Sequence, residues 1–78
     1  MNWSENNRCP ITDERAQEAL PRMGDTIEMI CPTCGRFRIS GSSFETIKKY
    51  PTDQKLSFLH RAMERADKGA IPYIKDVP

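Results

Sequence analysis

Two cysteines, Cys31 and Cys34, stand close together in the run "ICPTCGRF", with a proline after the first and a glycine after the second. Thiolate sulfur is a preferred ligand of Zn²⁺, and a pair with this spacing typically supplies half of a tetrahedral site. A glycine after the second cysteine accepts the positive φ that such a tight turn requires. The run therefore predicts a metal-binding turn whose remaining ligands lie elsewhere in the chain.

Cys9 is the natural third ligand. It begins "CPIT", where a second turn of the same kind would read C-P-x-C, and this chain has Thr12 in the last position. A hydroxyl is a poor zinc ligand, so the fourth donor must come from another residue. Two candidates are His60, the single histidine of the sequence, and Asp13, which directly follows Thr12. In the alternative interpretation no metal is bound, and the cysteines behave as small buried apolar residues.

The length of 78 residues predicts one domain with a thin core, because so short a chain buries only about three-fifths of its unfolded surface. Domains of this size often depend on a metal, a disulfide or a partner. Three cysteines would leave one thiol outside any closed disulfide framework. The sequence shows neither an apolar run of membrane-spanning length nor a signal-peptide layout, so we expect a cytoplasmic protein with reduced thiols and no membrane partner.

The apolar pattern predicts a β-hairpin and three helices. "TIEMI" and "RFRIS" alternate apolar and polar residues, which indicates two half-buried strands with the cysteine pair at the tip between them. Helices are expected in "TDERAQEALPRM" from Thr12, in "SGSSFETIKKY" and in "DQKLSFLHRAMERADK". Residues 1–8 are expected to form a flexible N-terminal arm, residues 9–78 a single domain, and the tail "AIPYIKDV" an extended segment that packs back.

Three stretches, "CPI", "GDTIEMICPTCGRFRISGSSFETI" and "KLSFLHRAMERADKGAIPYI", together resemble a small zinc-ribbon module of bacteria and phages. The specific part is "CPTCGRFRISG", and the resemblance covers residues 9–74. It implies metal ligands at Cys9, Cys31 and Cys34, with the remaining ligand position at Thr12. The expected fold class is therefore α+β, a small zinc-ribbon-like β-hairpin with about three helices packed on it.

An enzymatic function is not expected, because the sequence contains one histidine, no glycine-rich phosphate loop and no nucleophile motif. Small size and the resemblance together favour a non-enzymatic protein-binding module of phage or mobile-element type. Such a protein would inhibit a host macromolecular assembly by occupying its surface, for example as an anti-CRISPR or other anti-defence protein. The expected partner is a host protein or ribonucleoprotein complex.

The candidate contacts with a partner are four basic residues and two aromatic anchors: Arg36, Arg38, Lys48, Lys49, Trp3 and Phe58. The alternative function is a nucleic-acid-binding zinc-ribbon protein. Arg36 and Arg38 alternate on one strand and so share a face, which the two lysines could extend toward a phosphate backbone. A net charge of +1 argues against strong attraction to nucleic acid.

Overall fold

The computed structural model describes residues 2–22, 24–75 and 77–78, which form five strands and two α-helices. Their order along the chain is β1 (Asn2–Arg8), β2 (Arg15–Leu20), β3 (Thr26–Cys31), β4 (Gly35–Ser40), α1 (Gly41–Ile47), α2 (Thr52–Arg65) and β5 (Tyr73–Ile74). Neither helix in this part of the chain is long and apolar enough to cross a bilayer.

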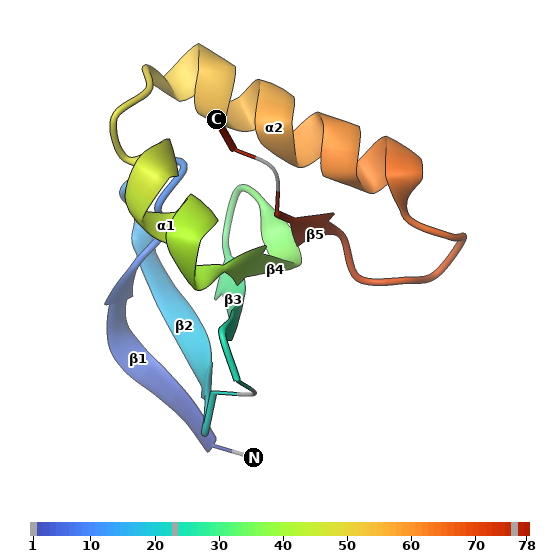
Figure 1. The fold of residues 1–78 in the computed structure, drawn as a ribbon. Helices are drawn as coiled ribbons and strands as arrows, with labels where there is room; N and C mark the ends of the chain where they lie inside the picture. The colour runs from blue at the N-terminus through green and yellow to red at the C-terminus, as the bar shows by residue number, and fades with distance from the viewer. Residues whose placement is uncertain (1, 23, 76) are drawn as a thin grey trace.

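The described strands join in one mixed sheet with the spatial order β1-β2-β3-β4-β5 (Figure 1). Strands β1 to β4 are antiparallel neighbours, whereas β5 pairs with β4 in parallel. Both helices lie in the connection between β4 and β5, as a parallel pairing requires a crossover. The short strand β5 is therefore the edge strand next to β4. This confirms the prediction that the tail packs back on the domain.

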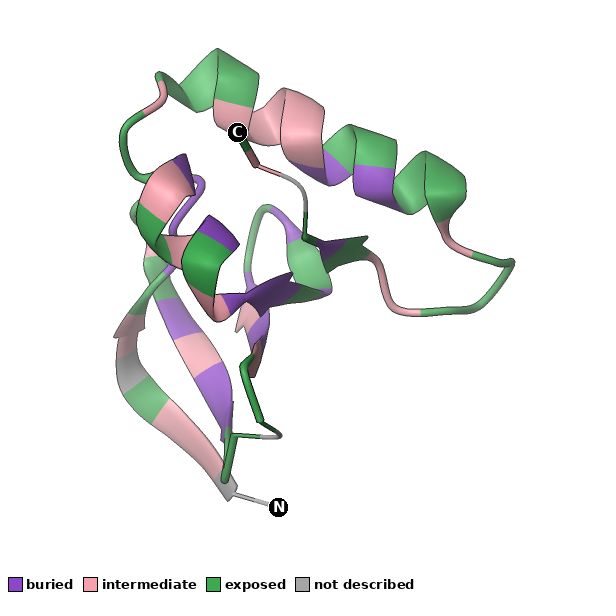
Figure 2. Cartoon of the chain, viewed as in Figure 1, coloured by how far each residue is buried: buried purple, intermediate pink, exposed green. Residues whose placement is uncertain are grey.

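The core lies between one face of the sheet and the two helices. Alternate residues of β3 and β4 point to this inner face, where Met29, Phe37 and Ile39 are at most 1% exposed. Ile47 of α1 and Leu59 of α2 join the same apolar cluster. Figure 2 shows that buried positions of α1 and α2 face the sheet while the opposite sides of both helices are exposed.

The expectation of about three helices packed on a hairpin is wrong, because the segment that begins at Thr12 contains strand β2 in place of a helix. The hairpin β3–β4 and the helices α1 and α2 do form where the sequence predicts them. Residues 2–8, expected as an arm, form strand β1 at the edge of the sheet.

The segment "RAQEAL" has good helix propensity, but tertiary pairing decides its conformation. Helices this short are marginal on their own, whereas β2 is hydrogen-bonded to a strand on each side. Thr12 still makes a local bond typical of a helix N-cap, because its Oγ1 accepts the N–H of Glu14 at 3.4 Å. Asp13 between them has a φ of 62°, so the chain turns instead of continuing into a helix.

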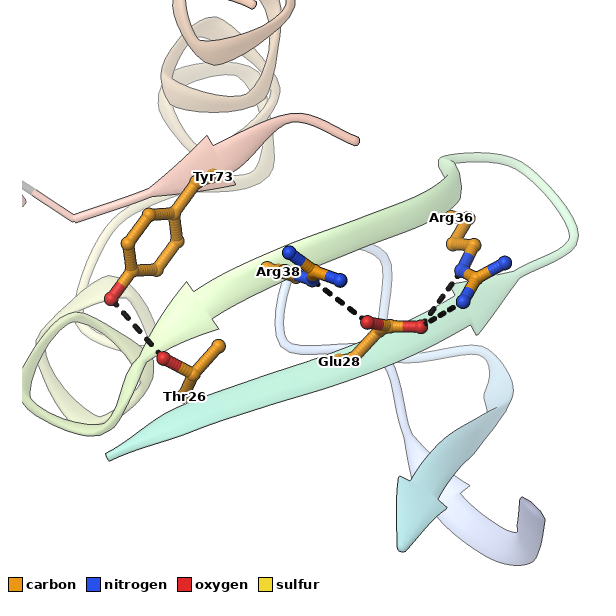
Figure 3. Close-up of polar contacts among 5 residues, drawn as sticks. All are labelled: Thr26, Glu28, Arg36, Arg38 and Tyr73. Carbon is orange, nitrogen blue, oxygen red and sulfur yellow. Dashed lines mark hydrogen bonds and ion pairs between the residues drawn. The ribbon is translucent and has the colours of Figure 1, made fainter. Parts of the chain in front are cut away.

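On the other face of the sheet, Glu28 of β3 lies between two arginines of β4 (Figure 3). Arg38 Nε and Arg36 Nε each donate to a different oxygen of the Glu28 carboxylate at 2.8 Å, and the side chain of Glu28 is only 10% exposed. Burial by itself raises the pKa of Glu28, but the hydrogen bonds from Arg38 and Arg36 outweigh this effect and lower it. We name the face that carries Thr26, Glu28, Arg36, Arg38 and Tyr73 the outer face.

Replacing Glu28 with Gln should lower the free energy of unfolding by about 1 to 2 kcal/mol at pH 7, because the three hydrogen bonds from Arg36 and Arg38 lose their charged acceptor. Since the pKa of Glu28 is lowered by folding, its contribution is complete above the pKa of about 4.3 of an unfolded glutamate and disappears as the pH falls through the lower folded value. Urea denaturation of both proteins between pH 3 and pH 7 measures this difference.

Glu45→Gln is the matched control, because the Glu45 carboxylate is 75% exposed and lies 3.7 Å from Lys48 Nζ. This substitution should change the free energy of unfolding by less than about 0.5 kcal/mol. If the free energies of unfolding of wild type and Glu28→Gln differed by a constant amount down to pH 3, this would contradict the assigned role of the Glu28 carboxylate.

Candidate metal centre

Three buried thiols converge at one end of the sheet. The sulfur atoms of Cys9, Cys31 and Cys34 all lie within 4.8 Å of one another, and Cys9 Sγ is 3.7 Å from Cys34 Sγ. The residues are 2%, 1% and 6% exposed, respectively, and none of them is in a disulfide. Among the His, Cys, Asp and Glu side chains of the described residues, these three cysteines are the group whose ligand atoms lie close enough together to hold a metal ion.

Two turns bring the cysteines together. Cys31 ends β3 and Cys34 immediately precedes β4, where Gly35 adopts a φ of 76° and pairs with Cys31 to close the hairpin. Cys9 follows β1, and its carbonyl accepts the N–H of Asp13 at 2.9 Å. The positive φ of Asp13 after Thr12 matches that of Gly35 after Cys34. The two turns therefore share a backbone feature, although Thr12 stands where the second turn has a cysteine.

Two oxygen-bearing side chains approach Cys31 from the first turn. Thr12 Oγ1 lies 3.4 Å from Cys31 Sγ, and Glu14 Oε1 lies 3.6 Å from the same sulfur. Sequence reasoning missed Glu14, because it was expected in the first turn of a helix. No spacing rule indicates this contact in advance, because Asp13, with a φ of 62°, turns the chain between Thr12 and Glu14.

The thiols differ in how readily they ionise. Burial raises the pKa of Cys31, but hydrogen bonds from the Thr12 side chain and from the backbone of Cys34 and Thr33 outweigh it and lower this pKa. Burial raises the pKa of Cys34, and the neighbouring Cys9 and Cys31 raise it further. Several thiolates so close together repel one another, and a divalent cation among them would remove this penalty.

Glu14 itself is held by its neighbours. Hydrogen bonds from Thr33 and Thr12, with a smaller one from Cys31, lower the pKa of the Glu14 carboxyl group. Its backbone carbonyl accepts the N–H of Cys9 at 2.8 Å, which fastens Glu14 to the turn that carries the first thiol. An oriented carboxylate therefore stands at the edge of the three-thiol cluster.

The structure does not bring His60 or Asp13 into the cluster. His60 is exposed on α2, and Asp13 is exposed in the turn between β1 and β2. The group of mutually close ligand atoms in the described residues contains neither of them, and it does not contain Glu14, whose contact in the cluster is with Cys31. Three of the four metal ligands expected from the sequence, the three cysteines, are thus together, and His60 is apart from them.

The predicted partner contacts fall on two different sides of the sheet. Arg36 and Arg38 lie on the outer face, 46% and 47% exposed, and Trp3 of β1 joins them because the Arg36 guanidinium sits 5.5 Å from its ring centroid. Lys48 instead lines a hollow on the helix side together with Met29 of the inner face. The lysines therefore do not extend the row formed by the two arginines.

Lys48, Lys49 and Phe58 have distinct surroundings. Lys48 Nζ lies 4.2 Å from the ring centroid of Phe44, whereas Lys49 is exposed just after α1. Phe58 is half-buried against the core, with its ring edge-on to Tyr50 at a centroid distance of 5.1 Å. Phe58 therefore serves packing, while Lys49 is open to solvent.

Comparisons with protein-family models, with curated proteins and with solved structures find no match for this chain. The resemblance to the zinc-ribbon module accordingly rests on the residues quoted above and stays a prediction.

Replacing Thr12 with Cys should tighten zinc binding by about tenfold or more, because it adds a thiolate next to Cys31 in a turn that already has the required backbone conformation. Competition with a chromophoric chelator measures the affinity. Thr52→Cys is the control, since it adds a thiol at the exposed start of α2. Equal affinities of wild type and both variants would show that position 12 does not face the metal.

Proposed function

We propose that this protein is a small, non-enzymatic binding module whose fold is stabilised by a zinc ion held by Cys9, Cys31 and Cys34. The observation that carries the proposal is the convergence of three buried thiols from two separate turns. Structural zinc sites are built from such thiolate ligands, and they contribute free energy that a small core does not supply.

Tetrahedral zinc is favoured by the distance between two of the sulfurs. With a Zn–S bond of about 2.3 Å, two ligands of one tetrahedral zinc ion lie about 3.8 Å apart. Cys9 Sγ and Cys34 Sγ are separated by 3.7 Å. The soft thiolate donor set and this spacing support zinc over calcium or magnesium, which prefer oxygen ligands.

The purified protein should contain one zinc ion, and its removal by a chelator should lower the melting temperature, because metal binding is coupled to folding. Native mass spectrometry gives the stoichiometry, and alkylation of the thiols reports whether they are protected. Cys9→Ser should lose both the zinc and the protection. A mass equal to that of the protein alone, with all three thiols reactive, would exclude the zinc site.

The binding surface in this proposal is the outer face. The helices pack on the opposite side, and the outer face presents Tyr73, 41% exposed, beside Arg36 and Arg38 (Figure 3). Aromatic residues and arginines are enriched among the residues that contribute most to protein–protein binding. Because Glu28 pairs with both arginines, their guanidinium groups are already oriented.

A protein partner is favoured over nucleic acid by the charge of this face. Glu28 offsets part of the charge of Arg36 and Arg38, and the net charge of the whole chain is +1. Nucleic-acid binding draws most of its strength from uncompensated basic residues. The narrower hypotheses, a phage-type inhibitor of a host assembly and a cytoplasmic location, stay predictions from size, composition and resemblance.

Arg38→Gln should weaken capture of the partner, since it removes an exposed guanidinium from the outer face while Glu28 keeps Arg36 as its ion-pair partner. Affinity capture from a host lysate, with and without nuclease, compares this variant with wild type. Lys68→Gln, at an exposed site after α2, is the control and should capture the partner like wild type.

The same experiment separates the two classes of partner. Capture that disappears with nuclease, or a shift of labelled DNA or RNA that weakens steeply with salt, would favour the nucleic-acid alternative. Equal capture by wild type, Arg38→Gln and Lys68→Gln would show that the partner does not bind the outer face.

A further inference from the structure

We propose that Glu14 supplies the fourth ligand of the metal centre through a carboxylate oxygen. The donor set is then three thiolates and one carboxylate, all from the two turns at one end of the sheet. This inference rests on the proposed function, since it requires that the three thiols hold a divalent ion.

A carboxylate oxygen of Glu14 lies at ligand distance from one of the three cysteines, Cys31. A zinc ion with a Zn–S bond of about 2.3 Å and a Zn–O bond of about 2.0 to 2.2 Å holds the sulfur and oxygen about 3.5 Å apart. Glu14 Oε1 and Cys31 Sγ are 3.6 Å apart, and Cys9 Sγ and Cys34 Sγ are 3.7 Å apart. Each separation is that expected between two ligands of one ion. The ligand atoms that all lie within 4.8 Å of one another are those of the three cysteines without Glu14, so the Glu14 carboxylate has to turn toward Cys9 and Cys34 when the ion binds.

The backbone holds Glu14 in this position independently of its side chain. The carbonyl of Glu14 accepts the N–H of Cys9 at 2.8 Å, so the main chain of Glu14 is bonded to that of a cysteine of the cluster. The N–H of Glu14 donates to Thr12 Oγ1 at 3.4 Å. Outer-shell contacts of this kind orient metal ligands. The Thr12 hydroxyl, although 3.4 Å from Cys31 Sγ, is neutral and serves as an orienting group.

Charge also favours Glu14 over His60. Four cysteine thiolates around Zn²⁺ leave a net charge of about −2, and three thiolates with one carboxylate leave the same charge. A neutral imidazole would leave about −1. Glu14 therefore restores the negative charge that is absent at Thr12, and it does so from a side chain in contact with Cys31, whereas His60 is exposed on α2.

Titration of the metal-free protein with Co²⁺, followed by competition with Zn²⁺, tests this assignment, because the visible absorption of Co²⁺ reports its ligands. Glu14→Gln should weaken affinity on the order of 10- to 100-fold and shift the visible bands. Glu14→His should recover much of the affinity, because it restores a ligand atom. Asp13→Asn removes a neighbouring charge while keeping a residue that tolerates positive φ, and His60→Gln removes the histidine; both should bind Co²⁺ like wild type.

X-ray absorption of the zinc-loaded wild-type protein tests for imidazole without a variant, and three sulfur ligands with one oxygen are expected. A water molecule would give the same oxygen signal, so unchanged Co²⁺ affinity in Glu14→Gln would assign that oxygen to water and overturn the assignment of Glu14. A signal from imidazole, or loss of affinity in His60→Gln with Glu14→Gln unchanged, would overturn the assignment of Glu14 while leaving the zinc site intact. Failure of the wild-type protein to bind Co²⁺ or Zn²⁺ would overturn the proposed function as well, so the two failures are distinguishable.

Discussion

The structure depends on the meeting of three thiols between the turn that follows β1 and the turn that joins β3 to β4. These turns belong to different hairpins, and the cluster of Cys9, Cys31 and Cys34 joins them at one end of the sheet. In a chain of 78 residues the apolar core is thin, so a link between hairpins has a large share in stability. Crowded thiolates repel one another, and a divalent ion bound among them would convert this repulsion into a cross-link.

The two faces of the sheet differ in the kind of interaction they carry. Apolar residues of β3 and β4 pack under the helices, while Glu28, Arg36 and Arg38 form a satisfied ionic cluster on the outer face. The cluster holds long side chains in place at the surface, which reduces the entropy lost when a partner binds. It also offsets positive charge, and for this reason the function proposed above takes a protein partner in preference to a phosphate backbone.

The candidate site was predictable in part. The spacing of Cys31 and Cys34 predicts a turn with paired thiols, and the C-P motif at Cys9 indicates where the third thiol belongs. The identity of the fourth donor was not predictable, because it depends on whether residues after Thr12 form a helix or a strand. The turn that leads into β2 places Glu14 beside Cys31, while His60 is exposed on α2.

Local pattern alone determined the β3–β4 hairpin and the two helices after it, because their apolar periodicity and turn residues agree with their final burial. The tertiary structure decided the fate of the segment from Thr12 to Leu20. Its composition favours a helix, but pairing with a strand on each side satisfies the backbone of β2 and leaves the thiol of Cys9 beside Cys34. Long-range hydrogen bonds and the convergence of the two turns outweighed the helix propensity of this segment. Intrinsic helix propensities differ by only a few tenths of a kcal/mol per residue among ordinary residues, so tertiary interactions readily override them.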